Sequence, residues 1–205
     1  MSSERSTTVG HVYSDEDWYG EDLTGLVFRD CTFREVDLTE CTSSGASFES
    51  CTFTNCRFNA SQHTGSAFVA CEFRRTSFFG ATLDGCKLDG SVFVECTLRP
   101  LSVKGGRWRG VTLRGGDLRR LELAGVSLPE ADLSEANLDD ASLRGCDLER
   151  ATLRSASLAG TDLRGASLAG VDLELARLRG TRLDLAGSVH LAERLGAMVD
   201  RSGQV

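Results

Sequence analysis

Hydrophobic positions recur at every fifth residue over most of this chain. From Leu23 to Leu183 each fifth residue is apolar except Ser43 and His63, and no insertion or deletion breaks the register. We call these positions the central column. A second column, two residues earlier, is small or apolar. Neither helical periodicity nor strict strand alternation keeps a five-residue repeat on one face. The pattern therefore predicts a coil that turns after every five residues, with both columns pointing inward.

Glycine marks a longer period of 20 residues. Eight glycines, from Gly25 to Gly165, follow one another at this interval. Such a column suits a backbone position with positive φ, which glycine adopts without strain because it has no Cβ. Four five-residue sides therefore make one turn. Stacking at the usual distance between strands, about 4.8 Å, predicts roughly eight coils in a rod about 40 Å long.

The predicted interior changes along the chain. Nine of the ten Phe residues lie in the central column between positions 28 and 93, and an unbroken series of Leu begins at Leu113. Between them, Gly106 stands two residues before Trp108, which suggests that a small neighbour compensates for the volume of the indole. We expect a slight kink between the Phe-rich and the Leu-rich halves.

The repeat is clearest from Ala131 to Leu183, in units such as Ala-Asp-Leu-Ser-Glu and Ala-Asn-Leu-Asp-Asp. Through this pattern the chain resembles the pentapeptide-repeat family. The resemblance implies an all-β fold, a right-handed quadrilateral β-helix. Residues 61–68 and 90–101 also resemble the mycobacterial fluoroquinolone-resistance members of the family, which inhibit and shield DNA gyrase as mimics of DNA.

The two ends of the chain depart from the repeat. Residues 1–20 contain three aromatic side chains beside an acidic run, which predicts an N-terminal cap with an aromatic plug. The β-helix is expected over residues 21–185. Residues 186–205 predict a short amphipathic helix with Ser188 as its N-cap, which closes the last coil. As the resemblance implies, this helix is also expected to form a homodimer. The expected interface consists of Leu191, Ala192, Leu195, Met198 and Val199.

Composition narrows the functional classes. The 205 residues carry a formal net charge of -7, which argues against direct binding of nucleic acid, because that needs clustered Lys and Arg. No stretch has the pattern of a signal peptide or a membrane span, so the cytoplasm is the expected location. The eight cysteines all fall in the small column. They are expected to be buried and apolar in character rather than to form disulfides or bind metal.

The sequence gives little support to an enzyme. His63 occupies an inward position and is expected to be a core histidine with satisfied hydrogen bonds. No phosphate-binding loop, zinc-binding motif or nucleophile elbow is found. We therefore expect no catalytic residue, cofactor or metal.

Acidic residues gather in one coil, residues 130–149, where Arg144 is the single base. We call this set the acidic band. It consists of Glu130, Asp132, Glu135, Asp139, Asp140, Asp147 and Glu149. Upstream, seven bases between Arg99 and Arg120 oppose only Asp117 and form a basic belt. One hypothesis is that the band, near the centre of a dimer, contacts a basic DNA-binding groove. The alternative is that both regions are solvated faces that pair across coils.

The resemblance and the charge pattern lead to one expected function and two alternatives. The expected function is a dimeric, non-catalytic DNA mimic that binds a type II topoisomerase, chiefly DNA gyrase, with topoisomerase IV as a second candidate. It would inhibit the enzyme or protect it from fluoroquinolone-type poisons. The alternatives are a structural or adaptor repeat protein with another protein partner, and a self-resistance factor in an antibiotic producer.

Overall fold

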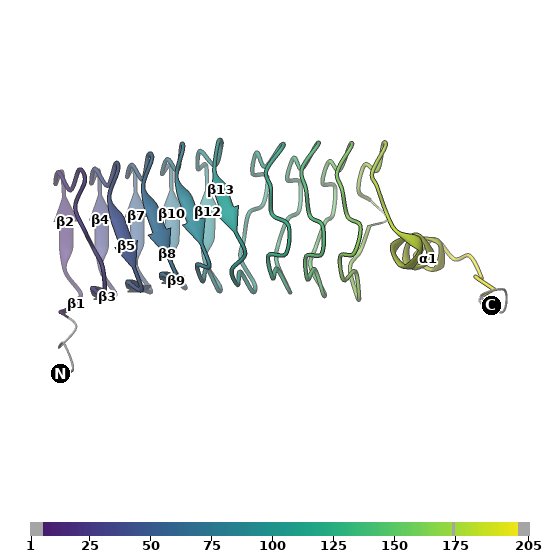
Figure 1. Cartoon of the computed structure of the whole chain (residues 1–205), viewed down its shortest axis with the longest axis horizontal. Coiled ribbons are helices and arrows are strands. Elements are labelled where there is room, and N and C mark those ends of the chain that lie inside the picture. The colour runs from purple at the N-terminus through teal and green to yellow at the C-terminus, as the bar shows by residue number, and fades with distance from the viewer. Residues whose placement is uncertain (1–5, 174, 201–205) are drawn as a thin grey trace.

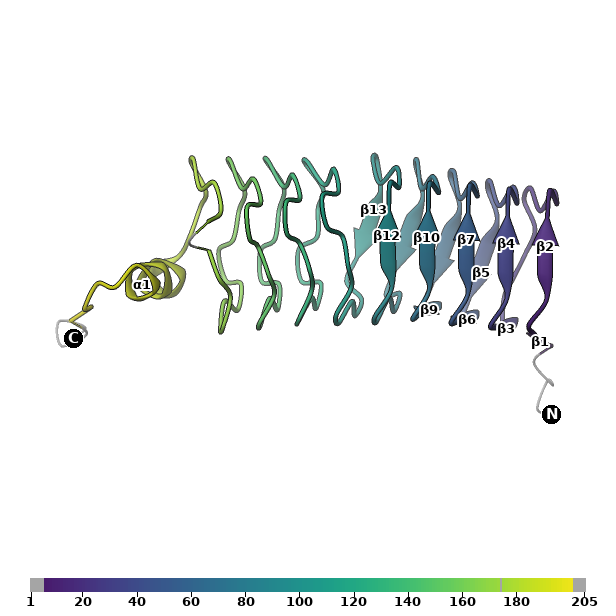
Figure 2. The same cartoon turned by 180° about the vertical axis from the view of Figure 1, so that it is seen from behind.

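The computed structural model describes residues 6–173 and 175–200, which coil into a rod with a helix at the C-terminal end (Figures 1 and 2). Paired residues in neighbouring coils are 20 positions apart, as in Thr52 with Glu72, and every pair is parallel. Five-residue sides and a 20-residue turn give four sides to each coil. The expected four-sided β-helix is therefore confirmed, and the 20-residue offset continues to the bridge between Asp162 and Arg182.

Regular strands form three parallel sheets on three sides of the first coils. The first sheet contains β1 (Thr7–Val9), β3 (Val27–Arg29), β6 (Ser47–Glu49) and β9 (Ala67–Val69). The second contains β2 (Val12–Ser14), β4 (Thr32–Arg34), β7 (Thr52–Thr54), β10 (Glu72–Arg74) and β12 (Val92–Val94). The third contains β5 (Thr42–Ser44), β8 (Gln62–Thr64), β11 (Thr82–Asp84) and β13 (Ser102–Lys104). On the fourth side, and after β13, coils are joined by single bridges.

The central column fills the interior, as the sequence predicts. Phe33, Phe53, Phe73 and Phe93 stack in register on one side, with ring centroids 4.6 to 4.8 Å apart. This distance equals the spacing of strands in a sheet, so each coil places its ring directly on the ring of the coil before it. In the C-terminal half the same positions are Leu, and those from Leu113 to Leu173 are buried.

The coil begins earlier than the sequence pattern suggested. β1 and β2 pair with β3 and β4, so described residues before Gly20 belong to the first coil rather than to a separate cap. The reason is that Thr8, Tyr13 and Trp18 continue the central column. The aromatic plug is present, since Tyr13 stacks on Phe33 with centroids 4.9 Å apart and Trp18 packs beside it. Residues 1–5 of the expected cap lie outside the described residues.

The C-terminal helix starts before the position that we predicted. α1 spans Leu185–Arg194, and its N-cap is Asp184 rather than Ser188. One oxygen of the Asp184 carboxylate accepts from the N–H of Gly187, and the other accepts from the N–H of Gly165, both at 2.8 Å. These bonds hold the pKa of Asp184 below its ordinary value. The carboxylate therefore caps the helix and ties it to the preceding coil, which the Ser188 hydroxyl, inside the first turns, cannot do.

The helix also ends earlier than expected, so Met198 and Val199 lie beyond it. Buried Gly187 lets the helix approach the last coil, because a Cβ there would lie 3.0 Å from the Leu183 side chain. Leu191 packs against the apolar core. α1 thus closes the last coil, as predicted. No helix in the described part of the chain is long and apolar enough to span a membrane.

The ladder between coils is interrupted once, where the two halves meet. On two sides it continues, through Lys87 with Arg107 and Val92 with Thr112. On the other two, no bridge among the described residues joins the coil of residues 97–102 to that of 117–122. Both ribbon views show a wider separation after β13 than between the neighbouring coils (Figures 1 and 2). A wedge that opens on two sides only is the geometry that a kink requires.

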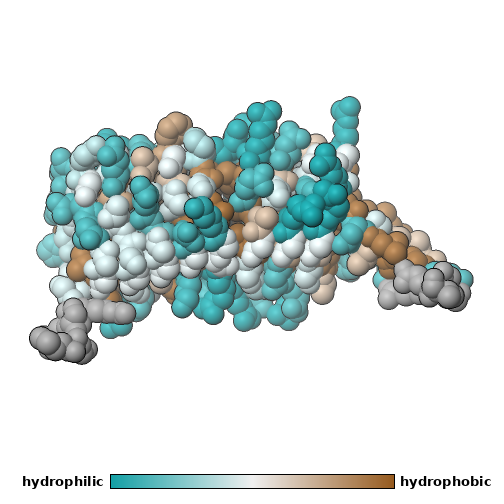
Figure 3. Space-filling view, viewed as in Figure 1, coloured by the Kyte–Doolittle hydropathy of each residue, from teal (hydrophilic) through white to brown (hydrophobic). Residues whose placement is uncertain are grey.

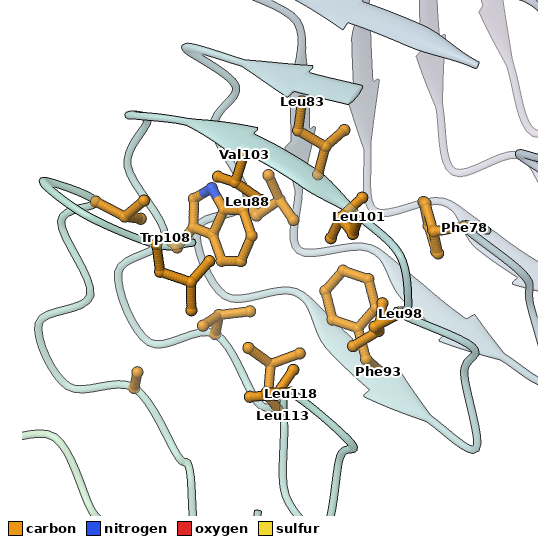
Figure 4. Close-up of a cluster of buried hydrophobic side chains, with 14 of the residues drawn as sticks. Phe78, Leu83, Leu88, Phe93, Leu98, Leu101, Val103, Trp108, Leu113 and Leu118 are labelled. Carbon is orange, nitrogen blue, oxygen red and sulfur yellow. The ribbon is translucent and has the colours of Figure 1, made fainter. Parts of the chain in front are cut away.

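The sequence contains the causes of this interruption. Pro100 has no N–H, whereas the equivalent residues of other coils, such as Gly80 and Arg120, donate to the next coil. Trp108, 3% exposed, fills the interior beside the wedge, among Leu98, Leu101 and Leu118 (Figure 4). Gly106 makes room for it, since a Cβ there would lie 3.2 Å from the indole nitrogen. The φ of +110° and a distance of 2.5 Å from that Cβ to the Cys86 carbonyl oxygen also favour glycine.

Candidate functional site

The exposed carboxylates of the acidic band are largely paired with arginines from neighbouring coils. Glu130 forms ion pairs with Arg109 at 2.8 Å and with Arg150 at 2.7 Å. These contacts, first the hydrogen bond from Arg109, hold the pKa of Glu130 below its ordinary value. Glu135 pairs with Arg114 at 2.6 Å. Asp140 lies 3.9 Å from Arg120, and Glu149 lies 3.8 Å from Arg150.

The other carboxylates of the band hold the backbone. Asp132 and Asp147 each accept from an amide two residues later, at 2.9 and 3.0 Å. Asp139 reaches the next coil, where it accepts from the Ser157 hydroxyl at 2.6 Å and from the Ala159 amide at 3.0 Å. The structure therefore shows the band and the basic belt pairing across coils, as one of the two interpretations of the sequence expected. A role of the band in binding a partner stays a proposal.

A second acidic surface lies at the N-terminal end of the rod and was not singled out from the sequence. It is a groove of about 570 Å³, and we call it the N-terminal acidic groove. It is lined by Asp15, Glu16, Asp17, Glu35, Asp37, Asn55 and Arg57. One ion pair crosses it within the described structure, between Arg57 and Asp37 at 2.8 Å. The available signal was the 20-residue period, which stacks residues 15 and 17 on residues 35 and 37.

Exposed apolar side chains gather at the opposite end of the rod. Leu195 is 64% and Met198 98% exposed, and Leu175 and Leu185 are also exposed. Figure 3 shows hydrophobic surface beside the helix at this end. Of the predicted dimer residues, Leu191, Ala192 and Val199 are half-buried, and Leu191 packs against the core of its own chain. The unpartnered surface therefore centres on Leu195 and Met198, beyond the last turn of α1.

A serine–histidine cluster lies inside the rod. Ser43 and His63, the two polar residues of the central column, are stacked neighbours, with Ser43 Oγ 2.7 Å from His63 Nδ1. Ser61 Oγ lies 3.1 Å from His63 Nε2, and the ring is 0% exposed. Burial lowers the pKa of His63 to about 4. The expected core histidine is confirmed, and with no solvent-accessible face its ring has the environment of a structural group.

The cysteines lie in the interior column where the sequence placed them. Seven are buried and Cys96 is half-buried. Most of these thiols point to carbonyls of the preceding coil, as Cys56 does to Phe33 at 3.4 Å, and burial raises the pKa of Cys56 to about 11. No cluster of three metal-ligating side chains is found among the described residues.

Comparison with known proteins places this fold. The protein-family model described as pentapeptide repeats (8 copies) matches this chain over residues 27–61, 64–99, 109–145 and 146–184. The chain belongs to the pentapeptide-repeat family. No curated protein matches it in sequence.

Solved structures share the fold of this pentapeptide-repeat chain at low sequence identity. Full-length QnrB1, described as a plasmid-mediated fluoroquinolone resistance protein, is 21% identical with a TM-score of 0.61. The match covers 94% of this chain and 100% of QnrB1. A trypsin-treated variant of QnrB1 is 22% identical with a TM-score of 0.64, covering 96% of this chain and 98% of the variant. These matches confirm the fold.

Proposed function

We propose that this protein is a non-catalytic DNA mimic that binds a type II topoisomerase, chiefly DNA gyrase, and inhibits it or protects it from fluoroquinolone-type poisons. The observation that carries the proposal is the N-terminal acidic groove, in which five carboxylates face one guanidinium. The fold shared with QnrB1, whose description names fluoroquinolone resistance, supports the choice of partner. Such a partner would place the protein in the cytoplasm.

The charge density of the groove suits this role. Its charged residues come from three successive coils, so a net charge of about -4 extends over roughly 10 Å when coils are about 4.8 Å apart. Duplex DNA carries one charge per about 1.7 Å, and the groove therefore comes within a factor of two of that density. The acidic band has seven acids against the five of the groove, but exposed members of the band already contact arginines. Electrostatic attraction of this kind speeds association and weakens as salt is added.

We also propose that the rod dimerises through its C-terminal end, which would bring two acidic bands near the dimer centre. The support is the exposed apolar pair Leu195 and Met198. Replacing both with Asp should give a monomer in sedimentation while the unfolding temperature stays unchanged. Phe79→Asp, which changes a 56% exposed side chain elsewhere on the rod, is the matched control and should not alter the oligomeric state. A dimer that survives the double change would place the interface elsewhere.

A gyrase supercoiling titration, with and without a fluoroquinolone, tests the main proposal. The protein should inhibit supercoiling or relieve drug-induced cleavage at micromolar concentration. If it does neither, the proposal is wrong and the adaptor alternative takes its place.

Charge reversal then locates the surface. The groove set is Asp15→Lys, Asp17→Lys and Glu35→Lys, and the band set is Glu130→Lys, Asp132→Lys, Asp139→Lys and Asp140→Lys. Three reversals to Lys at exposed Asp30, Glu95 and Glu122, as many as in the groove set, serve as the control. We expect the groove set to abolish the effect on gyrase and the control to keep it, with each fold checked by thermal unfolding. Loss with the control set as well would indicate a response to net charge alone.

A further inference from the structure

The interruption of the ladder opens a cleft of about 550 Å³ on the side of the rod. Residues 96–101 form its N-terminal wall, and the coil of residues 117–122 forms the other wall. The lining consists of Cys96, Thr97, Leu98, Arg99, Pro100, Leu101, Asp117, Arg119, Arg120 and Leu121. It lies between the two acidic surfaces and belongs to neither of them.

Both walls carry backbone groups that form ladder bonds in other coils. Leu138, two coils after Leu98, donates to the Ser157 carbonyl, and Asn137, one coil after Asp117, donates to the Gly116 carbonyl. At the cleft, the corresponding amides of Leu98 and Asp117 have no backbone partner among the described residues. The same holds on the adjacent side for the amides of Val103 and Glu122. Within the described structure the carbonyls that would accept these bonds also have no backbone partner, so each wall is an open backbone edge with donors and acceptors.

The side chains give the cleft a positive charge and an apolar floor. Arg99 and Arg119 both bind the Asp117 carboxylate at 2.7 Å, which leaves one uncompensated charge in that group. Arg120 is 77% exposed at its side chain and lies 3.9 Å from Asp140. Buried Leu98, Leu101 and Leu121 lie beneath, beside the Trp108 indole. A complementary ligand is therefore negative on one face and apolar on the other.

We propose that this cleft binds an extended peptide segment of a partner protein, with acidic side chains alternating with apolar ones, as an added β-strand. In a strand, successive side chains point to opposite faces. One set would reach the leucine floor while the other reaches Arg99, Arg119 and Arg120. Strand addition of this kind uses backbone hydrogen bonds for affinity and side-chain pockets for specificity. An inorganic anion would satisfy only the amides and arginines, whereas a peptide also satisfies the open carbonyls.

Fluorescence anisotropy with labelled eight-residue peptides tests the proposal on the full chain. An alternating Val-Glu peptide should bind, and an alternating Val-Lys peptide should not. A Val-Glu peptide that is N-methylated at every second amide keeps the charge but can donate from one strand edge only, so it cannot pair with both walls, and its affinity should fall at least tenfold. Arg120→Ala should weaken binding about fivefold or more. Arg154→Ala, which removes an exposed arginine in another coil, should leave affinity unchanged.

Each other result would overturn the proposal. Equal affinity for the methylated peptide, or full competition by millimolar inorganic phosphate, would make the cleft a simple anion site. If the Val-Glu peptide does not bind at millimolar concentration, the cleft is not a site for this kind of peptide. A change of oligomeric state in Arg99→Glu with Arg120→Glu would instead assign the cleft to an interface between copies of this chain. None of these results depends on gyrase, so the two proposals fail separately.

Discussion

The two halves of the rod keep the same pitch with different interiors and different corners. Up to Lys104, three of the four sides form three-residue strands around stacked phenylalanines. After Trp108 the sides shrink to single bridges, and corner after corner closes with a turn bond from the amide three residues after the central Leu. Ala156 to Leu153, at 3.1 Å, is an example. The offset of 20 residues is therefore fixed by the backbone ladder, while the central residue and the corner can change.

Where the two halves meet, their coils do not pair on all four sides. A coil with extended corners and a coil with turned corners differ in outline, so they match on two sides and separate on the other two. The indole of Trp108 occupies part of the space that results, and the rest is the cleft. In this chain the change from Phe-rich to Leu-rich coils coincides with a local defect in the ladder, and the defect falls where Pro100 removes a ladder donor.

Truncating one core residue in each half should change the unfolding free energy most, and it compares the two interiors directly. Phe53→Ala removes a ring whose centroid lies 4.6 and 4.8 Å from those of Phe33 and Phe73, and it leaves a cavity between those two rings. It should cost about 4 kcal/mol of unfolding free energy, and Leu143→Ala, in the Leu half, about 3 kcal/mol. Chemical denaturation of both variants measures the difference. A larger loss at Leu143 would mean that the phenylalanine ladder is not the tighter half.

The next effect in size is the pH dependence of stability, because the buried histidine, His63, lies in the Phe-rich half. Its folded pKa of about 4 is below the ordinary value of 6.5, so the unfolded chain takes up the proton first as pH falls. Stability is therefore full above pH 6.5 and declines until pH 4. Between pH 7.5 and 4.5 the loss should be about 2 to 3 kcal/mol.

Denaturation of the native chain and of His63→Leu at both pH values tests this point. The variant should lack this part of the pH dependence. Asp117 and Asp162 do not add to this window, because their pKa values are lowered by arginine and their contribution is lost only in stronger acid. An equal pH dependence in both proteins would show that His63 is protonated in the fold.

Much of this architecture could be predicted from periodicity alone. Inward columns, stacked coils and the buried cysteines all follow from spacing, because a ladder without insertions leaves no freedom in register. Even the pairing of Ser43 with His63 follows from their separation of 20 residues, although the prediction of a core histidine with satisfied hydrogen bonds named no partner for it. The same step would have found the N-terminal acidic groove.

What spacing could not predict depends on side-chain choices between nearby groups. Asp184 and Ser188 can both cap a helix, and only the contact of Asp184 with Gly165 decides between them. The arginines of the basic belt could face solvent or the acidic band, and long side chains reach the next coil at little cost. The side on which the ladder opens depends on the fit between two whole coils, which no single column encodes.

A substitution at the junction itself should change the unfolding free energy least. Trp108 is buried, yet its indole N–H is the one buried side-chain group among the described residues without a hydrogen-bond partner. Trp108→Phe removes this unsatisfied donor together with some packing volume. The first change gains about 1 to 3 kcal/mol and offsets the second, so unfolding free energy should change by less than about 1 kcal/mol.

Trp18→Phe is the matched control, in the same column. The Trp18 indole donates to Glu16 at 2.8 Å, so Phe there loses a hydrogen bond worth about 1 kcal/mol. We therefore expect the half-buried tryptophan at the end of the rod to be at least as sensitive as the buried one at the junction. A loss of 2 kcal/mol or more at Trp108, about the cost of breaking a satisfied buried hydrogen bond, would mean that its N–H has a partner such as water. The junction would then be a packed joint rather than the defect where two kinds of coil meet.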